Sequence, residues 1–184
     1  ISAQAAVLME ASSGDVIYEK NMHAPLPMAS ITKIMTLVLA LEAVQAGNVR
    51  LDDTVTTSEY ANKMGGSQIW LEVGEQMTLK DMLYAIAVGS ANDAAVAVAE
   101  YLSGSEASFV DEMNRRAREL GLANTVFSNA SGLPPKTLGM DAEHHASAYD
   151  LGLLSRHAVR IPSLLEMVAT HEYVMRPDTT KKPI

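Results

Sequence analysis

Three apolar segments dominate the hydropathy pattern of the chain, and each has the character of a buried helix. Residues 29–46 place apolar side chains on nearly every helical face and end before Gly47, a common C-terminal signal. Residues 78–89 repeat apolar positions at helical spacing behind Thr78, a residue type that caps helix N-termini. Residues 91–102 are rich in alanine and valine. These segments predict a helical core with residues 29–46 at its centre.

Three further helices are predicted after this core. Residues 105–120 combine apolar and charged positions at helical spacing, and Gly121 follows as a C-terminal cap. Shorter helices are expected at residues 148–159 and 162–168. The stretch before them, residues 124–135, is rich in turn-forming residues and is expected to lack regular structure.

Short strands are predicted near both ends of the chain. Residues 5–10 and 16–19 are apolar segments separated by a Ser-Ser-Gly-Asp turn, which predicts an antiparallel hairpin. A Thr/Val strand is expected within residues 51–58, then a loop over residues 62–74, and a last strand at residues 171–175. Strands at the ends with helices between them favour the α+β class, a helical cluster beside an antiparallel sheet.

Composition narrows the functional classes. The chain has 184 residues, enough for one domain, with 48% hydrophobic residues and a net charge of −8. It has no cysteine, which excludes disulfides, thiolate zinc sites and a cysteine nucleophile. The chain contains no run of basic residues, so a nucleic-acid partner is not expected. No apolar run reaches the roughly 18 residues of a membrane span. Residues 176–184 form a polar tail.

The first chemical candidate is Ser30 with Lys33 at the start of the central helix. Residues i and i+3 share a helix face, about 5–6 Å apart at Cβ. Burial would disfavour the charged amine and lower its pKa, so that the lysine can take the serine proton. Composition alone gives about 0.6 Ser-x-x-Lys pairs by chance. The hypothesis of a nucleophile and its base therefore depends on placement, after a proline-rich break and before a buried helix.

The second candidate is Ser90-Ala91-Asn92, which lies on the short connection between two predicted apolar helices. A hydroxyl and a carboxamide at this point could reach the same site as Ser30. The alternative is a structural role, in which Ser90 or Asn92 caps the following helix.

These motifs match two of the three that mark penicillin-binding proteins and class A β-lactamases. Over residues 3–184 the chain resembles the D-alanyl-D-alanine carboxypeptidases, the low-molecular-mass penicillin-binding proteins of serine peptidase family S11. The strings that carry the resemblance are AVLM at residues 6–9, GDVIYEKN at 14–21, PMASITKIMT at 27–36, SANDA at 90–94 and NASGLP at 129–134.

The resemblance implies a penicillin-binding protein/β-lactamase-like transpeptidase fold with a helical subdomain and a five-stranded sheet. Ser30 would be the acylated nucleophile, with its backbone N–H as half of the oxyanion hole, and Lys33 would be its base. Ser90 would relay a proton to the leaving D-alanine, and Asn92 would hold the substrate amide. Ser67 matches a family serine near the rim of the active site.

The third family motif, Lys-Thr-Gly, is not found. The nearest string, Lys136-Thr137-Leu138-Gly139, is interrupted by Leu138 and follows two prolines in a turn. We therefore expect residues 1–184 to be the N-terminal part of a single DD-peptidase catalytic domain, incomplete at its C-terminal end. A second polypeptide, or a remainder of the same one, would carry the strands with the triplet.

The resemblance implies hydrolysis of the terminal D-alanine from peptidoglycan stem peptides ending in D-Ala-D-Ala, through an acyl-enzyme that β-lactams would also form. The site would be extracytoplasmic, with any membrane anchor outside this chain, and would need no cofactor. A β-lactamase, or a binding protein without turnover, remains as an alternative. A metal is not expected, although acidic and histidine residues cluster at Asp141, Glu143, His144 and His145.

Overall fold

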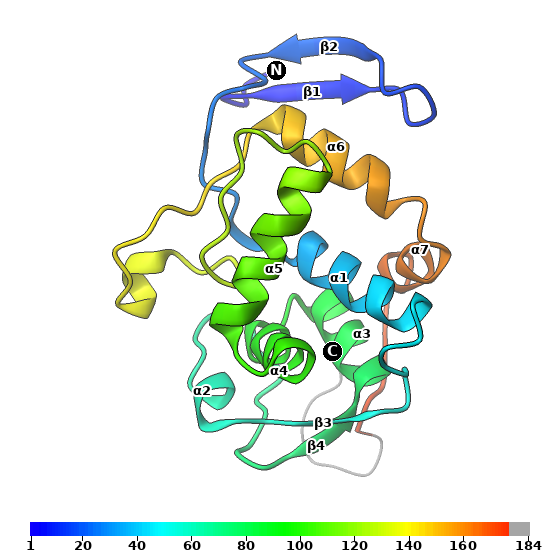
Figure 1. The fold of residues 1–184 in the computed structure, drawn as a ribbon, viewed down its shortest axis with the longest axis vertical. Helices are drawn as coiled ribbons and strands as arrows, with labels where there is room; N and C mark the ends of the chain where they lie inside the picture. The colour runs from blue at the N-terminus through cyan, green and yellow to red at the C-terminus, as the bar shows by residue number, and fades with distance from the viewer. Residues whose placement is uncertain (177–184) are drawn as a thin grey trace.

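The computed structural model describes residues 1–176, and helix α1 (Lys33–Gln45) lies at the centre of it (Figure 1). The short 3-10 helix η1 (Ala29–Thr32) leads directly into α1. Apart from the one-turn α2, every other α-helix of the described residues packs against α1. These helices are α3 (Leu79–Gly89), α4 (Asn92–Ser103), α5 (Glu106–Glu119), α6 (Ala148–Ala158) and α7 (Pro162–Val168).

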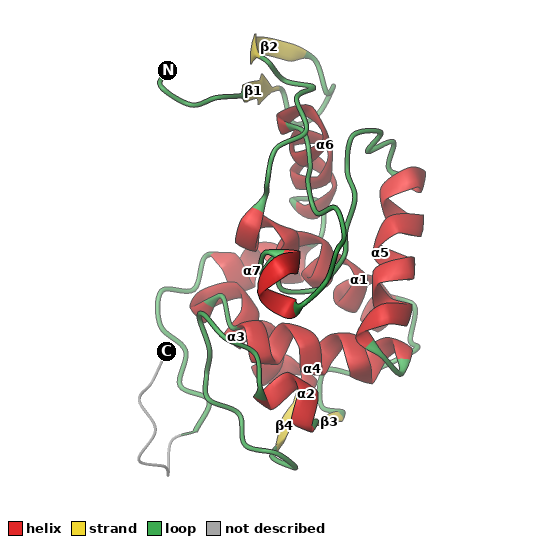
Figure 2. Ribbon diagram, turned by 90° about the vertical axis from the view of Figure 1, so that its left-hand side faces the viewer, coloured by secondary structure: helices red, strands yellow, loops and turns green. Residues whose placement is uncertain are grey.

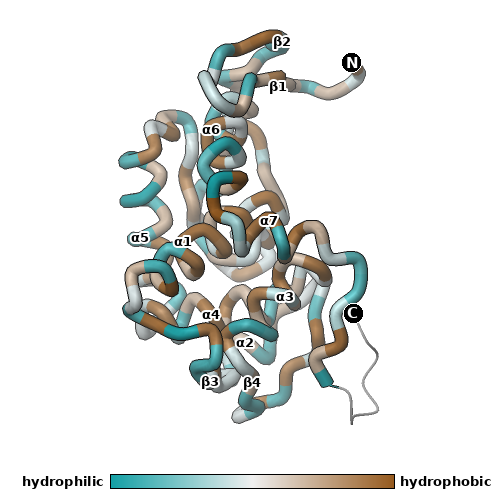
Figure 3. Tube along the Cα trace, turned by 90° about the vertical axis from the view of Figure 1, so that its right-hand side faces the viewer, coloured by the Kyte–Doolittle hydropathy of each residue, from teal (hydrophilic) through white to brown (hydrophobic). Residues whose placement is uncertain are grey.

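Side-chain size and polarity explain how the helices pack. Residues from both sides of α1 are buried, so the helix that was predicted to be central is enclosed. In α4, small side chains allow neighbouring backbones to approach closely: Ala94, Ala95, Ala97 and Ala99 are at most 1% exposed. Helix α5 is amphipathic, with Phe109 and Met113 buried and, apart from the buried Glu106, its charged residues toward the outside (Figure 3).

Side-chain caps fix where several helices begin. The hydroxyls of Ser58, Thr78, Ser105 and Ser147 each accept a hydrogen bond from the backbone N–H three residues later. Such caps are worth about 1 kcal/mol each. Thr78 thus starts α3 as the sequence predicted.

The strands form two separate antiparallel pairs. Strand β1 (Ala6–Met9) pairs with β2 (Val16–Lys20), with an irregularity after Leu8, and this hairpin packs against α6 (Figures 1 and 2). Strand β3 (Thr54–Thr56) pairs with β4 (Gln76–Thr78) at the opposite end of the molecule.

The predicted helices, the hairpin and the strand within residues 51–58 are confirmed. The strand predicted at residues 171–175 is wrong, because this segment is a loop held by side chains: Tyr173 stacks on Tyr84 and donates a hydrogen bond to Asp81. The sequence did not predict three short elements, which are β4, α2 (Glu59–Asn62) and η2 (Pro135–Leu138). All but the first residue of the predicted tail lies outside the described residues.

No helix within residues 1–176 combines the length and the apolar character that a membrane crossing requires.

Candidate active site

Ser30 lies on η1, at the point where the chain turns into α1. The preceding residue, Ala29, has a φ of +46°, which is unusual for a residue other than glycine. Ser30 is exposed, whereas Thr32 and Lys33 are buried. The turn therefore presents the Ser30 hydroxyl to solvent while the lysine side chain approaches it from inside the protein.

Three oxygens surround the Lys33 amine. Its Nζ lies 2.6 Å from Asn92 Oδ1, 2.6 Å from the Ser131 carbonyl oxygen and 3.4 Å from Ser30 Oγ. The structure thus brings together the lysine, the serine and the asparagine that the sequence singled out, although Lys33 and Asn92 are 59 residues apart.

The environment of Lys33 makes its amine easier to deprotonate than that of an ordinary lysine. Burial lowers the pKa of Lys33 to about 8, and the nearby Asp93 carboxylate partly opposes this effect. A neutral amine has two N–H donors and one lone pair. The two oxygens at 2.6 Å only accept hydrogen bonds, so they take the two N–H groups and leave the lone pair for the Ser30 hydroxyl. The geometry is that of a general base beside its nucleophile.

Asn92 joins the amine to the loop that contains Ser67. Its Nδ2 donates to the Gly65 carbonyl at 2.7 Å, and its backbone N–H donates to the Ser67 carbonyl at 2.8 Å. Ser67 itself is exposed. A side chain at Gly66 would meet Asn92 Nδ2 at 2.7 Å, so this loop needs a glycine to pass so close.

Ser90 ends α3 in a left-handed conformation with a φ of +52°, and its side chain is partly buried. No hydrogen bond of its hydroxyl to another described residue is found, and the N-cap of α4 is Ala91, which provides no side-chain cap. The capping alternative is therefore wrong for both Ser90 and Asn92. The carboxamide of Asn92 points at Lys33 and Gly65 instead.

Two residues of the site have a role that the sequence did not indicate. The Ser131 carbonyl contacts Lys33 inside a buried turn, in which Asn129 Oδ1 accepts from the backbone N–H groups of Ser131 and Gly132. Asp93 is fully buried and accepts from the backbone N–H groups of Ile69 and Leu71. Asp93 thus ties the Ser67 loop to α4.

The acidic and histidine cluster does not converge on a metal site. His144 turns inward, where it contacts Thr32 and Ser128, whereas Glu143 is exposed. No group of three or more histidine, aspartate or glutamate residues arranged to hold a metal ion is found within residues 1–176. Lys136 lies in η2 and lines a cavity of about 320 Å³ beside Ala29.

Comparisons with known proteins place this chain in a family. The sequence model of D-alanyl-D-alanine carboxypeptidase, Peptidase S11, matches residues 1–182. The carboxypeptidase DacF of Bacillus subtilis (strain 168) is 47% identical over 180 residues, which cover 98% of this chain and 45% of DacF. DacD of Escherichia coli (strain K12) is 35% identical over 163 residues, covering 85% of this chain and 40% of DacD.

Solved structures agree with the sequence comparison. The D-alanyl-D-alanine carboxypeptidase DacD from Francisella tularensis superposes with a TM-score of 0.91 and 32% identity, covering 100% of this chain and 43% of that one. The peptidoglycan synthesis regulatory factor PBP3 from Streptococcus pneumoniae has a TM-score of 0.91 and 33% identity, covering 100% of this chain and 54% of its own. The chain therefore spans less than half the length of the curated relatives it matches.

Proposed function

Because the chain belongs to the D-alanyl-D-alanine carboxypeptidase family, we propose that it carries the nucleophile and base of a serine D-Ala-D-Ala carboxypeptidase. The substrate is a peptidoglycan stem peptide, and the reaction removes its terminal D-alanine. One observation carries the proposal: the Lys33 amine, held by Asn92 Oδ1 and the Ser131 carbonyl at 2.6 Å each, lies 3.4 Å from Ser30 Oγ.

The reaction begins with proton transfer. Neutral Lys33 takes the Ser30 hydroxyl proton as Oγ attacks the carbonyl carbon of the penultimate D-alanine. The tetrahedral intermediate collapses, the peptide C–N bond breaks, and Ser90 relays a proton to the departing amine. Water then hydrolyses the ester, which frees Ser30 and the shortened peptide. A β-lactam acylates the same serine.

Asn92 retains the capacity to bind substrate. An asparagine side chain has two acceptor lone pairs on Oδ1 and two N–H donors on Nδ2. Lys33 and the Gly65 carbonyl use one of each. The remaining lone pair and N–H hold the amide of the stem peptide, next to the exposed Ser67 at the rim.

The second oxyanion donor and the group that binds the substrate carboxylate come from further strands that carry Lys-Thr-Gly. Two features of the hairpin support added strands. The first feature is that a lone two-stranded hairpin is only marginally stable, yet Leu8 and Ile17 of this hairpin are 54% and 65% exposed. Added strands would cover these apolar side chains. The second feature is an apolar cavity of about 610 Å³ that β1 and α6 line together, with Val7, Met9 and Leu151 among its residues.

The substrate sets the location of the reaction. Peptidoglycan stem peptides are assembled into the wall outside the cytoplasmic membrane, so the site works on the extracytoplasmic side. Its partners are the stem peptide and β-lactams, and the catalytic unit includes the segment that supplies the remaining strands.

A graft tests this function. The 180 residues of Bacillus subtilis DacF that match this chain are replaced by the chain, so that the relative supplies the rest of the domain. We expect the graft to release D-alanine from a peptide ending in D-Ala-D-Ala, and to release no L-alanine from the same peptide ending in D-Ala-L-Ala. A graft that forms a stable penicillin adduct but releases no D-alanine would indicate a binding protein and contradict the proposed turnover.

A further inference from the structure

The peptide unit between Ala29 and Ser30 fixes the direction of the Ser30 backbone N–H. A trans peptide is planar, and its C=O and N–H point in opposite directions. Whatever holds the Ala29 carbonyl therefore aims the Ser30 N–H. In the described residues no hydrogen-bond acceptor is found for this N–H, so the carbonyl side alone anchors the unit. The positive φ of Ala29 costs about 1–3 kcal/mol and requires such an anchor.

Thr32 and Gly132 provide the anchor. The fully buried Thr32 hydroxyl lies 2.7 Å from the Ala29 carbonyl oxygen, to which it donates. Gly132 packs against the same carbonyl beside Thr32, so closely that a Cβ would lie 2.0 Å from the oxygen and 2.9 Å from Thr32 Oγ1. Gly132 therefore blocks rotation of the carbonyl toward it, and the Thr32 hydroxyl holds the carbonyl oxygen in place.

His144 determines that orientation. Its Nε2 lies 2.7 Å from Thr32 Oγ1, and its Nδ1 lies 3.0 Å from the Ser128 backbone nitrogen. The Ser128 N–H can only donate, so Nδ1 accepts and the proton of the neutral ring is on Nε2. Nε2–H then donates to Thr32 Oγ1, which directs the single hydroxyl proton of Thr32 to Ala29. Burial lowers the pKa of His144 to about 4, which keeps the ring neutral at pH 7.

We propose that His144 is a positioning residue for acylation, which acts through Thr32 and the Ala29 carbonyl to aim the Ser30 backbone N–H at the oxyanion. This inference rests on the proposed function, because the Ser30 N–H binds an oxyanion only if Ser30 is acylated. It gives a role to a histidine that neither contacts Ser30 nor takes part in proton transfer.

Two matched pairs of variants test the proposal. His144→Gln retains an N–H donor at the length of Nε2, whereas His144→Asn is too short to reach Thr32 but can still accept from Ser128. Thr32→Ser keeps the hydroxyl, whereas Thr32→Val keeps the shape without it. Removing a whole oxyanion donor costs about 100–1,000-fold in rate. The His144→Asn and Thr32→Val variants should misdirect this donor without removing it, which should slow acylation by labelled penicillin about 10–100-fold.

The distinguishing measurements separate positioning from folding. The acylation rate constant should fall while the affinity of the preceding non-covalent penicillin complex stays within about threefold, and the Gln and Ser variants should stay close to wild type. The double variant Thr32→Val/His144→Asn should be no slower than either single one, because the two act in one chain of hydrogen bonds. Equal losses in all four variants, or an additive double variant, would overturn the proposal.

Nuclear magnetic resonance on the 184-residue chain gives a readout that does not need catalysis. We expect the His144 ring to carry its proton on Nε2 at pH 7, and the Ser30 amide resonance to move in the Asn and Val variants but not in the Gln variant. A proton on Nδ1, or an unmoved Ser30 amide, would contradict the positioning role. Absence of acylation in wild type would instead count against the proposed function.

Discussion

At the scale of single residues, the chemistry of the site depends on one buried amine. Lys33 is 4% exposed, and its three neighbours are oxygens of which two cannot donate a proton. The charged form is stabilised by Asp93 but loses more through burial, which brings the pKa of Lys33 to about 8. The amine is therefore a usable base near neutral pH, unlike an ordinary lysine with a pKa of about 10.4.

The pH dependence of acylation follows from this pKa. Below pH 8 most Lys33 amines are protonated and have no lone pair, so the acylation rate should rise about tenfold per pH unit and level off above pH 8. Lys33→Gln should lower the rate about 100–10,000-fold. The measurement is the rate of penicillin labelling between pH 5.5 and 9.5, corrected for spontaneous hydrolysis. A rate that does not change with pH would argue against Lys33 as the base.

Gly132 provides a prediction for stability. A Cβ at this position meets backbone atoms of Ala29 at 2.0 and 2.5 Å, and the φ of +83° disfavours any side chain. Gly132→Ala should therefore lower the free energy of unfolding by about 2–4 kcal/mol, by overpacking and backbone strain together. Denaturant titration measures the change.

Gly139 is the matched control, because its φ is +71° but no atom lies within 4 Å of its Cβ position. Gly139→Ala should cost only the backbone term, about 1 kcal/mol. Equal losses at Gly132 and Gly139 would show that the contact with Ala29 is not tight.

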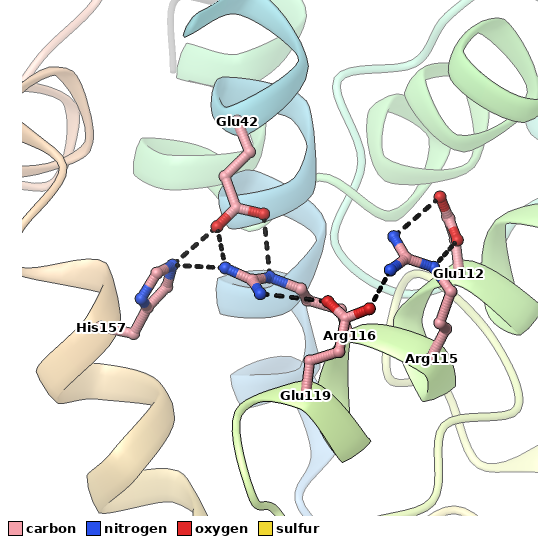
Figure 4. A network of polar contacts seen from close by, with 6 residues as sticks. All are labelled: Glu42, Glu112, Arg115, Arg116, Glu119 and His157. Carbon is pink, nitrogen blue, oxygen red and sulfur yellow. Dashed lines mark hydrogen bonds and ion pairs between the residues drawn. The ribbon is translucent and has the colours of Figure 1, made fainter. Parts of the chain in front are cut away.

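At the scale of elements, a polar network joins the three helices α1, α5 and α6 (Figure 4). Glu42 of α1 binds Arg116 of α5 through two hydrogen bonds, of 2.6 and 3.1 Å, and lies 2.7 Å from His157 Nε2 of α6. Burial alone would raise the pKa of Glu42, but the hydrogen bonds and charges of Arg116 and His157 outweigh it and lower the pKa. The ionised carboxylate therefore stabilises the helix arrangement.

Removing this charge should loosen the packing of α5 and α6 on α1. Glu42→Gln is expected to lower the free energy of unfolding by about 1–2 kcal/mol at pH 7. Because the folded pKa is lowered, the stabilisation is present above the unfolded pKa of Glu42 and is lost as pH falls through the folded value. The difference between wild type and Glu42→Gln should therefore shrink in acid.

Glu112 offers the comparison for this prediction. It pairs with Arg115 on the surface of α5, where both side chains are almost half exposed. Exposed ion pairs contribute about 0–1 kcal/mol, so Glu112→Gln should change stability by less than about 0.5 kcal/mol. If Glu112→Gln lowered the free energy of unfolding as much as Glu42→Gln does, the three-helix network would contribute no more stability than an exposed ion pair.

The elements also show why the sequence predicted some features and not others. Helices with a long apolar pattern, such as α1 and α4, were predicted because burial leaves a periodic signal. Strand β4 is three residues long and overlaps the cap of α3, so it leaves none. Residues 171–175 have the composition of a strand, but the stacking of Tyr173 on Tyr84 holds them as a loop.

At the scale of the whole molecule, the site is assembled from distant parts of the chain. Ser30, Lys33 and Asn92 could be predicted because their side chains form recognisable motifs. The Ser131 carbonyl could not, since a backbone oxygen has no sequence signature. The contact of His144 with Thr32 spans 112 residues, and only the fold reveals it.

The whole molecule also determines how fast Ser30 can react. Within residues 1–176, Ser30 is exposed, and so are Leu8 and Ile17 of the β1–β2 hairpin, which supports the proposal that further strands complete the site. The chain alone should therefore acylate slowly, and the DacF graft about 100-fold faster or more, the usual effect of restoring an oxyanion donor. Equal rates would show that the added strands are not needed.

The most direct test of the central claim is the covalent labelling of Ser30. Wild type and Ser30→Ala, each as the DacF graft, are incubated with a labelled penicillin. The intact mass of each protein is then measured, and peptide mapping locates any adduct. We predict one adduct per wild-type molecule, mapped to Ser30, and none in Ser30→Ala. An adduct that persists in Ser30→Ala, or a folded wild-type graft that forms none, would contradict the assignment of Ser30 as the nucleophile.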